Sequence, residues 1–141
     1  MYSSAVRQEV AEFLHERDGY AAQTDNIYLT NGASDGVKLL IQLLIRENEL
    51  GHNDGILCPV PQYPLYSGAV ALNHGHLLPY YLDEEVDWGL SIENLDKAYA
   101  DSKQNGQTAR ALVLINPGNP TGAVSVWSRQ RAVLLVLGLL S

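Results

Sequence analysis

Short, strongly apolar runs alternate along this chain with longer segments that have helical periodicity. The runs Gly55–Val60 and Ala111–Ile115 are apolar along most of their length, and Ala111–Ile115 in particular has the pattern of a strand that is covered on both faces. Helical patterns separate the runs, so the order predicts βαβ units, a parallel sheet and right-handed crossovers. We therefore expect an α/β fold, in which ligands bind at the carboxyl ends of the strands.

The expected elements follow from the spacing of apolar residues, from capping residues and from turn formers. Helices are predicted at Glu9–Arg17, Asp35–Arg46 and Leu65–Asn73, and from Ser91 towards Lys103. Strands are predicted at Asn26–Thr30, Gly55–Val60, Leu77–Leu82 and Ala111–Ile115. Ser34 is a candidate N-cap for the second helix, and that helix is apolar enough to be mostly buried.

The composition is that of one globular domain. The chain has 141 residues, of which 46% are hydrophobic and 18% charged, enough to build a core. The net charge of -7 and the scattered basic residues argue against a nucleic-acid partner, which needs clustered Lys and Arg. The apolar segment Ala132–Leu140 has about nine residues, far short of the roughly 20 that a membrane span needs.

The sequence contains no sign of a signal peptide or of a metal site. Its start has neither an apolar signal core nor an Arg-rich presequence, so we expect a cytoplasmic location, with a mitochondrial one left open. Cys58 is the only cysteine, and we interpret it as a buried strand residue in preference to a nucleophile. The four histidines lack the spacing of metal ligands, so no metal is expected.

The first candidate binding segment is Thr30–Asp35, which joins an expected strand to an expected helix. A glycine-containing turn at a helix start exposes backbone N–H groups, and the helix dipole favours an anion there. Ser34 adds a hydroxyl donor, whereas Asp35 could offer a phosphate only its backbone N–H. Taken alone, the segment is weak evidence for a ligand, because most capped helix starts of this kind bind nothing.

Two more candidate segments follow later strands. In PQYPLY, Pro61–Tyr66, prolines flank Tyr63 and can hold its ring for stacking on a planar heterocycle. From these residues alone, two tyrosines packed over a loop are the favoured interpretation. In NPGNPTG, Asn116–Gly122, two Pro and two Gly fix a sharp turn that holds the Asn119 amide. For this turn, structural and functional interpretations are evenly balanced.

Together, GASDG, PQYPLY and NPGNPTG resemble the large domain of fold-type I, class I/II aminotransferases, and GASD and NPGNPTG are most similar to the alanine aminotransferases. The resemblance covers about Tyr2 to Val124. It implies that residues 1–124 are the N-terminal part of a three-layer α/β domain with a mostly parallel sheet, left incomplete. Residues 125–141 are then a divergent apolar tail, which we expect to lie outside a stable domain.

The resemblance also implies a cofactor, pyridoxal 5'-phosphate (PLP), and a reaction. It places Ala33, Ser34 and Asp35 at the PLP phosphate and Tyr63 against the pyridine ring. It places Asn119 on the ring's phenolic oxygen and near the substrate carboxylate. The implied reaction is transfer of an amino group from L-alanine to 2-oxoglutarate, giving pyruvate and L-glutamate, with amino-acid and 2-oxo-acid substrates and a homodimer for the full-length family member.

The chemistry of that family also needs a lysine that forms an imine with PLP, and in the family this lysine follows the NPTG turn. The only lysines here are Lys38, Lys97 and Lys103, all on expected polar helix faces, so the chain is expected to be inactive alone. A non-catalytic remnant that binds PLP weakly or pairs with a full-length subunit remains an alternative. A nucleotide-binding module is disfavoured, because the sequence has neither G-x-G-x-x-G nor a Walker lysine.

Overall fold

The computed structural model describes residues 4–46 and 51–124. The chain forms two compact units, residues 1–36 and 37–141, which are described here one at a time. The expected apolar tail at 125–141 lies outside the described residues, so the boundary at residue 124 stays a prediction.

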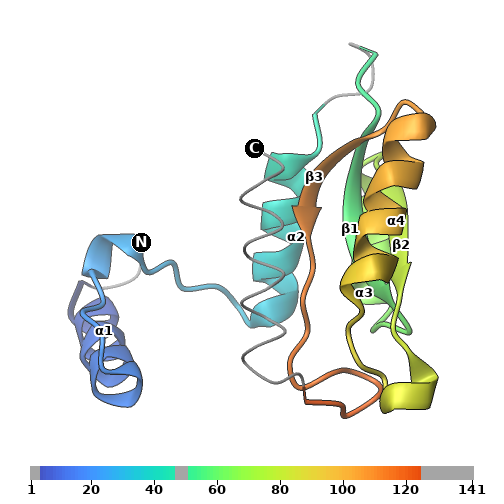
Figure 1. The fold of residues 1–141 in the computed structure, drawn as a ribbon. Helices are drawn as coiled ribbons and strands as arrows, with labels where there is room; N and C mark the ends of the chain where they lie inside the picture. The colour runs from blue at the N-terminus through green and yellow to red at the C-terminus, as the bar shows by residue number, and fades with distance from the viewer. Residues whose placement is uncertain (1–3, 47–50, 125–141) are drawn as a thin grey trace. The chain divides into compact units, whose positions relative to one another are not determined.

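A parallel sheet of three strands forms the centre of the second unit (Figure 1). The strands are β1 (Asp54–Val60), β2 (His76–Tyr81) and β3 (Thr108–Leu112), in the order β2-β1-β3. Gly55 of the central strand pairs with His76 on one side and with Ala109 on the other, both in parallel. The α/β architecture with a parallel sheet is therefore confirmed.

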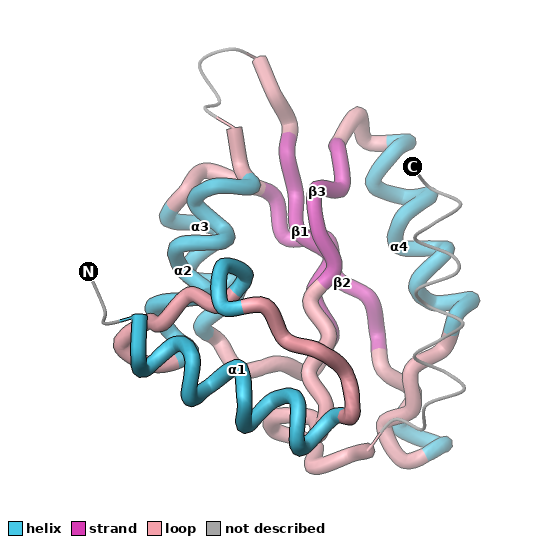
Figure 2. Tube along the Cα trace, turned by 90° about the vertical axis from the view of Figure 1, so that its left-hand side faces the viewer, coloured by secondary structure: helices cyan, strands magenta, loops and turns pink. Residues whose placement is uncertain are grey.

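Helices lie on both faces of this sheet (Figure 2). The helices α2 (Ala33–Leu44) and α3 (Leu65–Leu72) cover one face, and α4 (Ile92–Gln104) covers the other. Side chains of a strand alternate between the two faces, so Ile56 packs with Ile41 and Val70. Its neighbour Leu57 packs instead with Leu78 and Leu95.

The sequence predicted most elements of this unit to within a few residues. Ser91 caps α4 as expected, because its hydroxyl accepts a hydrogen bond from the Asn94 N–H at 3.3 Å. The strand expected at Ala111–Ile115 lies earlier, at Thr108–Leu112, because pairing with β1 begins at Asp54 and Thr108. The prediction that both faces of this strand are covered is wrong, since every position along β3, an edge strand of the described sheet, is either half-buried or exposed.

Asp54 anchors the amino-terminal edge of the sheet through an ion pair in which its own carboxylate is buried and Arg46 is partly exposed. Its side chain has no exposed surface, and Arg46 approaches it with Nη2 at 2.6 Å, Nε at 2.8 Å and the backbone N–H at 3.0 Å. Arg110 is the extra residue in a β-bulge of β3; its Nε donates to the Leu44 carbonyl and lies 3.8 Å from Asp54. Hydrogen bonds from Arg46 lower the pKa of Asp54 to about 2.

The first unit contains α1 (Ser4–Asp18) and a 3₁₀ helix at Thr24–Asn26. The Thr24 hydroxyl donates to Gln8 Oε1 at 3.0 Å and so joins the two. The strand predicted at Asn26–Thr30 is wrong: the described residues supply no strand to pair with it, and Tyr28 is 84% exposed.

Helix α2 differs from its prediction at both its start and its surface. It begins at Ala33, so Ser34 lies inside the first turn and is not the residue that precedes the helix. A tight turn leads into it, in which the Gly32 N–H donates to the Thr30 carbonyl at 2.8 Å and Gly32 has φ +88°. The helix is also less buried than predicted, with an exposed apolar face made of Leu39, Leu40 and Leu43.

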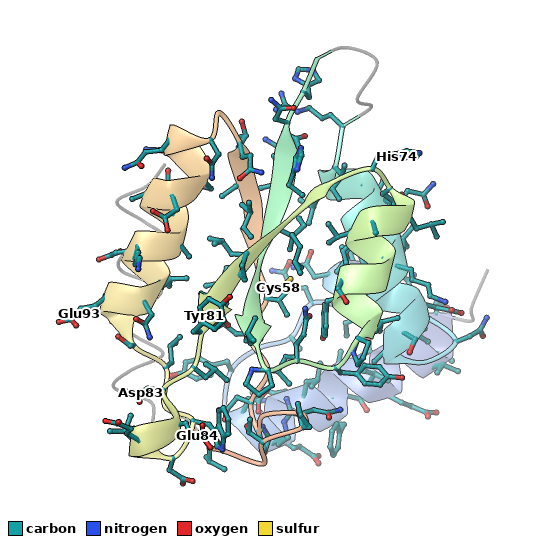
Figure 3. The ribbon with its side chains drawn as sticks, turned by 90° about the vertical axis from the view of Figure 1, so that its right-hand side faces the viewer. Cys58, His74, Tyr81, Asp83, Glu84 and Glu93 are labelled. Carbon is teal, nitrogen blue, oxygen red and sulfur yellow. The ribbon has the colours of Figure 1, made fainter. Side chains whose placement is uncertain are left out.

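The described residues include a buried cysteine but neither a metal site nor a membrane-spanning helix. Cys58 lies fully buried in the middle of β1 (Figure 3), and burial raises the pKa of its thiol to about 12, so the interpretation as a core residue is confirmed. Within 4–46 and 51–124, no group of side chains has the arrangement of a metal site. No helix in those ranges has both the length and the apolarity to cross a bilayer.

Candidate functional site

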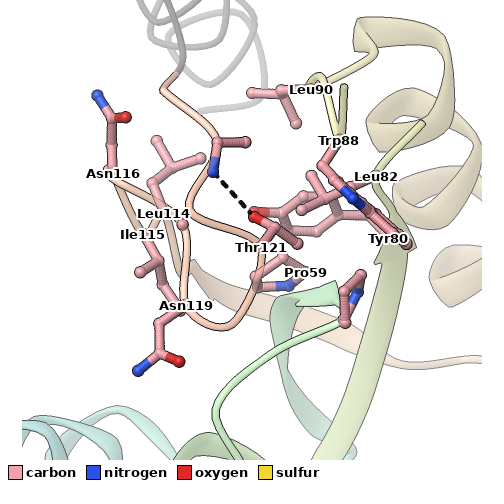
Figure 4. Close-up of a pocket in the computed structure, with 13 residues that line it drawn as sticks. Pro59, Tyr80, Leu82, Trp88, Leu90, Leu114, Ile115, Asn116, Asn119 and Thr121 are labelled. Atoms are coloured by element: carbon pink, nitrogen blue, oxygen red, sulfur yellow. Dashed lines mark hydrogen bonds between the residues drawn. The ribbon is translucent and has the colours of Figure 1, made fainter. Parts of the chain in front are cut away.

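A pocket lies at the carboxyl-terminal edge of the sheet, where the segments that follow all three strands meet (Figure 4). β1 and the residues after it contribute Pro59 and Pro61. β2 and its following loop contribute Tyr80, Leu82, Trp88 and Leu90, and the segment after β3 contributes Leu114, Ile115, Asn116, Gly118, Asn119, Thr121 and Ala123. Two of the three segments singled out from sequence therefore meet here, as the strand-end rule for parallel sheets predicts.

The NPGNPTG turn is held by its own backbone. The Gly118 N–H donates to the Ala123 carbonyl and the Gly122 N–H to the Gly118 carbonyl, both at 2.8 Å. The Thr121 hydroxyl accepts from the Ala123 N–H at 3.3 Å (Figure 4). A side chain at position 118 would displace the Thr121 hydroxyl, and a residue other than glycine at position 122 would be strained by the φ of +71°.

Asn119 lies at the exposed tip of this turn. In Figure 4 its amide points away from the ring of Tyr80 and from Trp88, which form the opposite wall of the pocket. The bonded turn thus presents the amide to the outside, where it can both donate and accept a hydrogen bond.

Tyr63 lies in the loop between β1 and α3. Its ring is 49% exposed, and its carbonyl accepts from the Tyr66 N–H at 3.5 Å as α3 begins. Tyr63 does not line the pocket, although its neighbour Pro61 does. The loop of Tyr63 and the turn of Asn119 therefore leave the same edge of the sheet and meet through Pro61.

Ala33, Ser34 and Asp35 form the first turn of α2 and belong to the first unit. The Gly36 N–H bonds to the Gly32 carbonyl at 3.4 Å, so the three amides before it have no acceptor inside the helix. Ser34 and Asp35 are exposed. Three N–H groups and a hydroxyl at a helix start can hold an anion; their convergence with Tyr63 and Asn119 stays a prediction.

Two further aromatic residues of the pocket, Tyr80 and Trp88, were not predicted from the sequence. Tyr80 is 2% exposed, and its hydroxyl donates to the Val113 carbonyl at 2.7 Å. The signal for it was Pro59, because a proline inside a central strand leaves a ladder hydrogen bond unmade. Trp88 follows the acidic run, which is a turn closed by hydrogen bonds between Asp83 and Gly89.

None of the three lysines lines the pocket. Lys38 is exposed on α2 beside Gln42, in a hollow between α2 and α3. Lys97 and Lys103 are exposed on α4, where the Lys103 ammonium lies 4.5 Å from the centre of the Tyr99 ring. These positions agree with the polar faces expected from the sequence.

Comparisons with known proteins identify a family. The model of the family "Aminotransferase class I and II" matches residues 2–131. Glutamate–glyoxylate aminotransferase 1 of Arabidopsis thaliana is 54% identical over 83% of this chain and 24% of its own length. The mitochondrial alanine aminotransferase 1 of the same plant is 50% identical over 92% of this chain and 23% of its own.

A solved structure gives the same result for the fold. The alanine aminotransferase of Pyrococcus furiosus superposes with a TM-score of 0.80 at 27% identity, over 96% of this chain and 32% of that one. The present chain spans about a quarter of the length of the curated relatives that it matches.

Proposed function

This chain belongs to the class I and II aminotransferase family, and on that premise we propose that it is the part of an aminotransferase that binds PLP and helps to hold the amino-acid substrate. The proposed reaction is amino transfer from L-alanine to 2-oxoglutarate. The observation that carries the proposal is the self-bonded NPGNPTG turn at the carboxyl-terminal edge of the sheet, with the Asn119 amide at its exposed tip.

The residues present fit the three parts of PLP. The amides at the start of α2 and the Ser34 hydroxyl supply donors for a phosphate dianion. The half-exposed ring of Tyr63 is flat and suits a planar pyridine ring. The Asn119 amide can donate to the phenolic oxygen of that ring. This match in chemistry supports PLP as the cofactor.

In the proposed mechanism, the chain binds and orients. PLP, when bound, supplies an electron sink that stabilises negative charge at the α-carbon of the amino acid. The dipole of α2 and the donors of its first turn hold the phosphate end. Tyr63 limits the tilt of the ring. Asn119 donates one N–H of its amide to the phenolic oxygen, and the second N–H of the same nitrogen remains free to orient the substrate carboxylate.

Two further hypotheses concern the substrate pair and the role of the chain. The name of the Arabidopsis relative makes glutamate and glyoxylate the second candidate substrate pair. A chain that binds PLP without catalysis, or that pairs with a full-length subunit, is the second candidate, and none of the three lysines lines the pocket. A homodimer of the full-length member and a cytoplasmic location stay predictions, and the mitochondrial name of one relative keeps that compartment a candidate.

Titration of the chain with PLP tests the binding proposal. Ser34→Ala removes one hydrogen bond to a charged group, worth about 1.5–3 kcal/mol, so we expect the dissociation constant to rise roughly 10- to 100-fold. Binding can be followed by PLP absorbance and by competition with inorganic phosphate, which the same variant should also weaken.

Ser4→Ala is the matched control, because Ser4 is an exposed first-turn serine of another helix, α1, and should leave the affinity unchanged. Equal affinity of the wild type and Ser34→Ala contradicts the phosphate assignment. A wild-type chain that binds no PLP at all contradicts the proposed function.

A further inference from the structure

The central strand β1 contains a proline at a position where the sheet needs a donor. Leu57 pairs with Leu112, and its carbonyl accepts from the Val113 N–H at 2.8 Å. In a parallel ladder the next bond runs from the residue two places further along β1 to the carbonyl of Val113. That residue is Pro59, which has no N–H.

Tyr80 supplies the missing donor from the other side of β1. It is the β2 partner of Pro59 in the register, and its hydroxyl donates to the Val113 carbonyl at 2.7 Å. The side chain thus reaches across the central strand to the chain that leaves β3. Tyr80 is 2% exposed, and burial raises the pKa of its hydroxyl, so the group remains protonated and able to donate.

The position of this bond connects it to the site. Val113 is three residues before Asn116, where the NPGNPTG turn begins. Tyr80, Pro59 and Asn119 line the same pocket (Figure 4). The turn is a closed unit with its own hydrogen bonds, so its orientation depends on the short segment that joins it to the sheet.

We propose that Tyr80 is a positioning residue for Asn119: its hydroxyl takes the place of the Pro59 amide and fixes the backbone from which the NPGNPTG turn departs. The assignment of Asn119 to the cofactor rests on the proposed function. The replacement of the Pro59 amide by the Tyr80 hydroxyl as the donor to Val113 does not. The two claims therefore need separate measurements.

Amide hydrogen exchange in the 141-residue chain, without PLP, tests the replacement. In Tyr80→Phe we expect the Val113, Gly118 and Gly122 amides to exchange about tenfold faster, the factor that one lost hydrogen bond gives, while amides of α4 keep their rates. Pro59→Ala restores an N–H to β1, so Tyr80→Phe made in that background should leave the same amides close to their wild-type rates. Tyr81→Phe is the control, because Tyr81 is 61% exposed.

Two results would overturn the replacement. If the amides of α4 exchange faster in Tyr80→Phe, as well as those of the turn, then Tyr80 has only a general role in packing. Failure of Pro59→Ala to rescue the turn amides shows that the hydroxyl does not stand in for the amide.

The PLP affinity of the same variants tests the positioning of Asn119. Tyr80→Phe should bind PLP several-fold more weakly, and the Pro59→Ala background should restore the affinity. Unchanged affinity in Tyr80→Phe, together with faster exchange of the turn, overturns the positioning role. A wild-type chain that fails to bind PLP overturns the proposed function. The exchange measurement still tests whether the Tyr80 hydroxyl takes the place of the Pro59 amide.

Discussion

Supplied with PLP, L-alanine and 2-oxoglutarate, the purified 141-residue chain should release no pyruvate. Covalent binding of PLP needs a lysine at the site, and Lys97 and Lys103 are exposed on α4 while Lys38 is exposed on α2. An assay coupled to lactate dehydrogenase measures the pyruvate. We expect the rate of pyruvate formation to equal that of the same mixture without the chain.

Borohydride reduction gives this experiment a second readout. Reduction should fix no PLP on the chain, because no lysine lines the pocket, and peptide mass mapping can check each of the three. Alanine-dependent pyruvate together with PLP fixed on Lys38, both lost in Lys38→Arg, would refute the prediction. The hollow between α2 and α3 that Lys38 borders would then be the active site.

The largest loss of stability from a single conservative change is expected at Asp54. In Asp54→Asn one of the two oxygens that accept from Arg46 becomes an NH₂ group, which faces the Arg46 donors in a place without exposed surface. Loss of a hydrogen bond to a charged group and burial of an unpaired donor together cost about 3 kcal/mol. Urea unfolding at pH 7 measures the difference.

The same cost should depend on pH in a defined direction. The pKa of Asp54 is lowered to about 2 by its hydrogen bonds to Arg46, so its contribution is complete above about pH 4, near the unfolded value, and disappears as the pH falls towards 2. The difference in stability between the wild type and Asp54→Asn should therefore shrink between pH 4 and pH 2, because the part that depends on the carboxylate charge is lost. Asp18→Asn is the control, because Asp18 pairs with Arg17 on the surface and should change nothing measurable. A difference that keeps its full size at pH 2 contradicts the role of the carboxylate charge.

The sequence predicted those parts of the fold that depend on local patterns. Gly55–Val60 was recognised as a strand because its residues are apolar on both faces, and the helix after Ser91 because of its cap. The segment Asn26–Thr30 has the residues of a strand, but a strand also needs a partner, and local sequence does not contain that information. The shift of β3 to Thr108–Leu112 has the same cause, since its register is set by Asp54 and Gly55 of another strand.

The candidate site was predicted to a similar extent. Turn formers identified the NPGNPTG turn and its asparagine, because Gly and Pro constrain the backbone wherever they occur. Tyr80 was overlooked because its role depends on Pro59, a residue more than twenty positions earlier, and on the register of β2 against β1. The side chains that support a binding turn from a neighbouring strand become visible only once the strands are paired.

The single cysteine, which lies inside β1, can serve as a chemical probe of how often the sheet is open. Cys58 has no exposed surface and a pKa near 12, so an alkylating reagent cannot reach a thiolate while the sheet is intact. When opening and closing are fast compared with alkylation, the rate of alkylation at neutral pH therefore follows the fraction of molecules in which the sheet is open. Because every modified molecule carries the label at one known atom, intact-mass spectra would give the opening free energy of the central strand directly, in the wild type and in each variant described above.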